Sequence, residues 1–212
     1  EDTPEEETLE QLIDRRAAFL TSYQNAAYAK SYTERLNRLH TALPADQADA
    51  LTATAARSLF KLMAYKDEFE VARLMSADSF RAELDREFDG DFTVKYHMAP
   101  PLLNFKTDAR GRPVKRALGA WMTPVLSLLA KGKTFRQSPL NPFAYHAEAR
   151  MHRELREWFQ NMVDDIIAYP TLVSTETLEQ ILKAPMEIRG YGPVREEAAI
   201  KVKAKVEMLR KH

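Results

Sequence analysis

One stretch of the sequence decides the fold class, and it reads LEQLIDRRAAFLTSYQNAAYAKSYTERLNRL from Leu9 to Leu39. Apolar side chains recur through it at intervals of three or four residues, which is the spacing of one face of an α-helix. Thr8 and Gln11 stand at its start with the spacing of a capping box. Because neither glycine nor proline interrupts the stretch, we expect one long helix that ends at about Leu39.

The same spacing predicts further helices along the chain, each bounded by proline, glycine or a capping residue. A helix over Ala45–Tyr65 could run on as far as Leu74, with a break near Lys66-Asp67. The other expected helices are a short one capped by Ser76 or Asp78 that ends before Asp89, Trp121–Leu129, Asn141–Ala168, one from Ser174 or Thr175 to Leu182, and Pro193–Leu209.

Between residues 91 and 118 the pattern changes. Phe92, Val94 and Tyr96 alternate with polar residues, which is the period of a β-strand. The polar turn at 108–113 would let Val114–Leu118 pair back as a hairpin. The sequence therefore predicts a mainly α fold, a helical bundle-like domain with a small antiparallel β-hairpin or sheet around residues 91–118.

The composition excludes several classes of protein. The 212 residues contain 31 basic and 31 acidic side chains, whereas general binders of nucleic acid or acidic membranes show a basic excess. The apolar runs are well short of the roughly 18 residues that a membrane span needs. Cysteine is absent, which excludes disulfides, thiolate nucleophiles and cysteine-ligated zinc or iron–sulfur clusters from this segment. We expect a cytoplasmic protein that binds neither nucleic acid nor membrane.

The ends of the sequence suggest how the chain is organised. Residues 1–7, EDTPEEE, are acidic and polar, and we interpret them as a solvated linker. A start at Glu1 rather than methionine indicates a piece of a longer protein. Residues 8–212 are expected to form a single domain.

The main candidate binding residues surround a pair of glycines. Gly190 and Gly192 precede a predicted helix, and amide groups freed there could bind an anion. Arg189 and Arg195 flank the pair and would attract a phosphate or a carboxylate. The alternative is that the glycines only permit the turn before a helix that starts at proline.

Four other residues could contact a ligand, each with a structural alternative. Lys66 could hold an anion, but it lies in a charged stretch typical of a salt-bridged helix face. His97, at the end of the predicted strand, could bind a ligand or be a hydrogen-bonded structural histidine. Glu148 and His152 have the spacing of two metal ligands, yet without a third ligand we favour a solvent-facing ion pair. We expect no catalytic residue, metal site or cofactor in this chain.

Three stretches together resemble one protein family. They are LIDRRAAFLTSYQNAAYA at 12–29, LMAYKDEFEVARL at 62–74 and IRGYGPV at 188–194, and the segments 92–103 and 139–143 fit as well. Over nearly its whole length the chain resembles the C-terminal domain of the large, fused indolepyruvate ferredoxin oxidoreductases of bacteria.

The resemblance implies a role within a larger oxidoreductase. In that family the N-terminal regions carry thiamine diphosphate, magnesium and iron–sulfur clusters. The parent enzyme would decarboxylate an aryl 2-oxo acid oxidatively to an acyl-CoA, with ferredoxin as the electron acceptor. None of the family's cofactor-binding residues matches a position here, so residues 8–212 would be a C-terminal accessory domain that packs on the catalytic domains or on a second subunit. The alternative is a domain that contributes to an anion, CoA or substrate site at a domain boundary.

Overall fold

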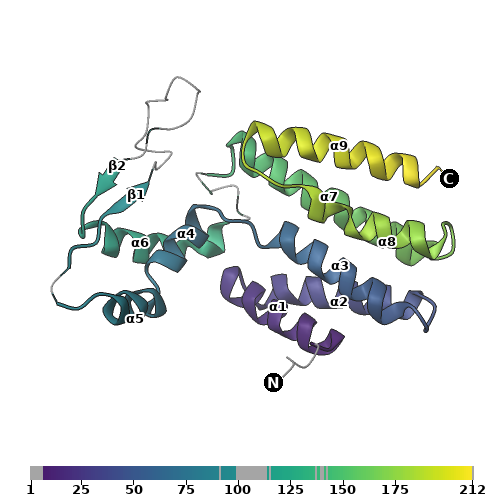
Figure 1. Cartoon of the computed structure of the whole chain (residues 1–212), viewed down its shortest axis with the longest axis horizontal. Coiled ribbons are helices and arrows are strands. Elements are labelled where there is room, and N and C mark those ends of the chain that lie inside the picture. Colours follow the sequence, from purple (N-terminus) through teal and green to yellow (C-terminus); the bar gives the residue numbers. More distant parts are fainter. Residues whose placement is uncertain are drawn as a thin grey trace. The chain divides into compact units, whose positions relative to one another are not determined.

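The computed structural model describes residues 7–90, 92–98, 114, 116–136, 138, 141 and 143–211. Within these residues, nine α-helices and one two-stranded antiparallel sheet make a mainly α fold, which confirms the predicted fold class. The chain divides into two compact units (Figure 1). We call residues 1–65 with 146–212 the bundle unit and residues 66–145 the insert unit, because the second interrupts the first in sequence.

The predicted long first helix is in fact two helices. α1 spans Leu9–Tyr23 and α2 spans Ala26–Ala42. Asn25 lies between them with an extended backbone, and its side-chain oxygen accepts a hydrogen bond of 2.8 Å from the amide of Tyr28. The prediction of one helix was wrong because an asparagine side chain can start a new helix without any glycine or proline. The capping box predicted at the start of α1 is present.

The third helix, α3 (Ala48–Met63), is the centre of the bundle unit. It contacts α1, α2, α7 (Ala147–Ala168) and α8 (Thr175–Lys183). Nine of its sixteen residues are buried, which requires neighbours on more than one face. Figure 1 shows α7, α8 and α9 (Pro193–Leu209) running alongside one another in this unit. All 28 buried members of the larger hydrophobic core belong to the bundle unit.

The C-terminal helices follow the sequence prediction except at one start. Ser174 caps α8 as predicted, and α9 begins at Pro193 and ends at Leu209. The helix expected from Asn141 instead begins at Ala147. That start was wrong because the Asn141 side chain forms a turn, accepting from the Phe143 amide at 2.9 Å and donating to a backbone carbonyl.

The described residues of the insert unit form three α-helices, one 3-10 helix and two paired strands. They are α4 (Glu68–Met75), α5 (Asp78–Glu87), β1 (Tyr96–Met98), β2 (Arg116–Leu118), α6 (Met122–Lys131) and the 3-10 helix η1 (Gly132–Phe135). The predicted break at Lys66-Asp67 is present, and α4 packs on α6. Tyr96 pairs with Leu118 in the antiparallel ladder, so the predicted hairpin is confirmed. The strand is shorter than expected because only three residues of each partner pair.

Some predictions fall outside these observations. The polar turn at 108–113 and residues 1–6 of the expected linker lie outside the described residues. That residues 8–212 act as one accessory domain stays a prediction, beside the observation of two compact units.

Candidate functional site

The loop before α9 brings the two glycines of the sequence prediction against the first turn of the helix. Gly190 and Gly192 have positive φ angles of 91° and 54°, which side chains rarely adopt. A Cβ atom at Gly190 would lie 2.8 Å from Cγ1 of Val194 and 3.6 Å from the amide nitrogen of Arg195. The glycine therefore lets the loop approach the start of α9, where no side chain caps the free amide groups.

Arg195, the third residue of α9, is buried without a counter-ion. Only 9% of its surface is exposed, and its Nε atom is buried with no hydrogen-bond partner. Its guanidinium carbon lies 5.9 Å from the centre of the Tyr65 ring. Burial lowers the pKa of Arg195, while the charges of Tyr65, Glu148 and Tyr191 raise it. The group stays charged, since arginine keeps its proton in proteins.

Tyr65 also contacts His152 of α7. The two rings stack with their centres 3.3 Å apart and their planes at 23°. His152 is 6% exposed, and both ring nitrogens are buried without a partner. Burial and the charge of Arg195 lower its pKa to about 3, so the imidazole is neutral at pH 7. The interpretation of Glu148 and His152 as a solvent-facing ion pair was wrong, because His152 faces the interior.

Lys61 of α3 adds a second constrained cation to this region. Its Nζ atom donates to the carbonyls of Pro185 at 3.0 Å and Met186 at 2.9 Å, just before the glycine loop. Burial, together with the charges of Arg195 and Arg189, lowers the pKa of Lys61 to about 8. The lysine is therefore protonated at pH 7 close to two arginines.

Five residues of the bundle unit thus form one site, which we call the α9 cluster: Lys61, Tyr65, His152, Arg189 and Arg195. The charges of Arg195 and Arg189 contribute to lowering the pKa of Lys61, and Glu148 acts on Arg195 only through its charge, without an ion pair. Like charges held together in this way favour a bound anion. The neutral imidazole leaves a ring N–H and a ring lone pair available beside them.

The structure brings together only part of the predicted ligand set. Arg189, Gly190, Gly192 and Arg195 lie in one loop and helix start, as predicted. The remaining two candidates belong to the insert unit, where Lys66 is an exposed residue before α4 and His97 an exposed residue of β1. Sequence reasoning missed Lys61 and Tyr65 and misplaced His152, since only the packing of α3 and α7 brings them to the loop.

Comparison of the sequence with known protein families identifies the family of this chain. The model of a family described as a family of unknown function, DUF6537, matches residues 9–208. The chain belongs to this family. Neither the search of curated proteins nor that of solved structures found a match.

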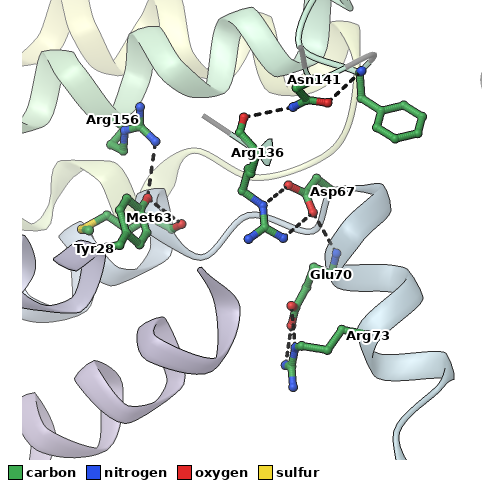
Figure 2. A network of polar contacts seen from close by, with 9 residues as sticks. Tyr28, Met63, Asp67, Glu70, Arg73, Arg136, Asn141 and Arg156 are labelled. Carbon is green, nitrogen blue, oxygen red and sulfur yellow. Dashed lines mark hydrogen bonds and ion pairs between the residues drawn. The ribbon is translucent and has the colours of Figure 1, made fainter. Parts of the chain in front are cut away.

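In this DUF6537 chain a second polar network lies in the insert unit. The Asp67 side chain caps α4 by accepting from the Glu70 amide at 2.8 Å, and Arg136 donates two hydrogen bonds to the same carboxylate. The Glu70 carboxylate, almost fully buried, receives two bonds from Arg73. Figure 2 shows both forked arginine–carboxylate pairs. Their groups are mutually satisfied, so the network fixes the start of α4 rather than forming a binding site.

The DUF6537 bundle unit has a polar chain of its own. In Figure 2 Arg156 of α7 points to the Tyr28 hydroxyl, to which it donates at 3.4 Å, and that hydroxyl donates to the Met63 carbonyl at 3.1 Å. These two hydrogen bonds tie α7, α2 and the end of α3 together.

Two further findings limit the chemistry of the described residues. No group of three or more histidine, aspartate or glutamate side chains among them could hold a metal ion. None of their helices is long and apolar enough to cross a membrane.

The insert unit has a pocket of about 190 Å³, whose lining includes Phe80, Arg81, Leu84, Tyr96 and Thr123. Arg81 is the one charged side chain among its described lining residues, so this pocket offers a ligand fewer charged groups than the α9 cluster does.

Proposed function

We propose that this chain is the C-terminal domain of a fused bacterial indolepyruvate ferredoxin oxidoreductase and serves there as a non-catalytic structural and interaction domain. The support is the resemblance of three sequence stretches to that family, together with apolar helix faces that the chain leaves exposed. The parent enzyme, rather than this chain, would decarboxylate an aryl 2-oxo acid oxidatively to an acyl-CoA.

The observation that carries the proposal is a set of exposed apolar side chains on α9. Ala199, Val202 and Val206 pack into the bundle core. Away from them, Val194, Ile200 and Met208 are 66%, 64% and 62% exposed. These three side chains are interspersed along α9 with charged ones, such as the exposed Glu197–Lys201 ion pair. Large apolar side chains of this kind are typical of interface cores.

The insert unit has a comparable face on α6. Trp121, Val125 and Leu128 stand four and then three residues apart, so they share one side of the helix, and all three are exposed. On the opposite side Met122 and Leu126 are buried. Both units therefore offer apolar helix faces to a partner, for which we propose the catalytic domains of the parent chain.

The remaining assignments follow from the parent. Thiamine diphosphate, magnesium and iron–sulfur clusters would bind in its N-terminal regions, which would also meet ferredoxin and CoA. The parent would be a cytoplasmic homo-oligomer in which this domain supports assembly. No cofactor is proposed for the domain itself.

Replacing both Ile200 and Met208 by glutamate tests the proposal. The isolated double variant should fold as the wild type does, because both side chains are exposed. In the parent enzyme we expect the charges to break the assembled oligomer on size-exclusion chromatography with light scattering. The matched control is E154K, an exposed change on α7 that should leave assembly intact. The proposal fails if the parent keeps full assembly and turnover with the double substitution, or with the domain deleted.

A further inference from the structure

We propose that the α9 cluster is a binding site for the oxyanion group of a ligand, a carboxylate or a phosphate, which Arg195 and the first-turn amides of α9 hold together. The inference goes beyond the structural role proposed above and does not depend on it. It rests on polar groups of the bundle unit that form no hydrogen bond within the protein, the Arg195 guanidinium and the first amides of α9.

The first observation is the arginine itself. A buried guanidinium is expected to have carboxylate or carbonyl partners, because desolvating it without them is costly. Arg195 has only the Tyr65 ring. Its Nε atom is sealed from solvent, whereas its two terminal nitrogens are not among the fully buried atoms and form no hydrogen bond. Such a guanidinium is oriented by its stem and presents its outer edge to an incoming group.

The second observation is the helix start. The side chain of Arg195 and its own amide belong to the first turn of α9, which no side chain caps. Gly190 keeps that amide uncovered, because any Cβ there would stand over it and against Val194. Free amides at a helix start favour negative charge, and here a nine-tenths buried arginine accompanies them.

The third observation is the surrounding charge. The charges of Arg195 and Arg189 both act on Lys61, whose Nζ atom is held by its two carbonyl acceptors. His152, neutral and without a hydrogen-bond partner at either nitrogen, stacks on the Tyr65 ring. An oxyanion bound by the fork of Arg195 would lie near the positive charges of Arg195, Lys61 and Arg189 and near one carboxylate, that of Glu148.

The test titrates the whole 212-residue chain and follows its NMR spectrum. Sodium phosphate and sodium acetate are added separately at constant ionic strength, with sodium chloride as the third titrant. We expect saturable shifts of the Arg195 Nε–H signal and of the Val194 and Arg195 amides with phosphate or acetate, and none with chloride. The oxyanion that saturates at the lower concentration identifies the ligand group as a phosphate or a carboxylate.

Matched variants decide whether these residues are responsible. R195K keeps the charge but lacks the fork, so we expect affinity to fall about tenfold, as loss of one charge-assisted hydrogen bond implies. R189Q, an exposed change that leaves the core untouched, should weaken binding severalfold. K201Q removes the same charge about 9 Å beyond Arg195 along α9 and should change nothing. The proposal is overturned if the shifts do not saturate, if chloride reproduces them, or if R195K and R189Q bind as the wild type does.

Discussion

His152 is a buried base that the folded protein keeps neutral. The unfolded chain binds a proton at this residue near pH 6.5, whereas the folded chain does so only near pH 3, because burial and the charge of Arg195 oppose the imidazolium. Between these values the unfolded state binds more protons, so stability rises with pH from about 3 to 6.5 and the histidine has no effect above that window.

Replacing His152 by phenylalanine should remove this pH dependence. The ring would still stack on Tyr65, and no polar atom would remain unsatisfied. Between pH 7 and pH 5 we expect the wild type to lose about 2 kcal/mol more unfolding free energy than H152F. Urea unfolding at the two pH values measures the difference. Equal losses in both proteins would show that His152 is not the titrating group.

Asp67 gives a second prediction at the scale of one side chain. It caps α4 and receives both hydrogen bonds of Arg136, and both side chains are largely buried. D67A should therefore destabilise the protein by about 3 kcal/mol, because it leaves an arginine without its counter-ion. D78A, an exposed acidic change at the first turn of α5, should cost less than about 0.5 kcal/mol. Chemical denaturation of both variants checks the contrast, and equal effects would contradict it.

Helices show where sequence reasoning succeeds and where it stops. The helix from Pro193 to Leu209 was predicted correctly because proline and the spacing of Ala199, Val202 and Val206 mark it locally. The break at Asn25 was missed, since a capping asparagine within a continuous apolar pattern gives no signal as strong as glycine or proline. The spacing of apolar residues predicts which segments are helical. Where each helix ends depends on whether a side chain, such as that of Asn25, binds a backbone amide in place of a carbonyl.

The start of α9 carries a prediction about a glycine. G190A combines a positive φ angle with a Cβ contact of 2.8 Å to Val194, so we expect it to lose about 3 kcal/mol of stability. G90A has a similar φ of 86° but open space around its Cβ, and strain alone should cost about 1 kcal/mol. Thermal unfolding followed by circular dichroism compares the two. If they cost the same, close packing of the loop on α9 is not what selects glycine at position 190.

At the scale of the whole molecule, the division into two units lay beyond the sequence. No glycine, proline or serine marks residue 65, and the helical pattern of Ala45–Leu74 runs across this first boundary; Ser138, Pro139 and Pro142 precede the second boundary, but they indicate only a bend. The candidate site was half predicted for the same reason. Arg189 and Arg195 are neighbours in sequence, but Lys61, Tyr65 and His152 join them only through long-range packing of the bundle unit.

Removing the insert unit should leave the bundle unit folded. Its core contains no residue from 66–145, and Tyr65 stacks on His152, so the two cut ends lie within reach of a short linker. We expect a chain in which about six glycine and serine residues replace 66–145 to remain helical and monomeric, with one cooperative thermal transition. A molten, non-cooperative product would show that the bundle unit needs the insert unit to fold.

The insertion also sets the order of events at the ribosome. When α3 has left the exit tunnel, α7 and α8, which cover it, are still untranslated, and the entire insert unit must be made first. At cellular rates of synthesis this takes roughly ten seconds. During that interval the faces of α2 and α3 that α7 and α8 cover in the folded unit have no native partner, so the nascent chain offers a chaperone a binding surface that the finished protein lacks.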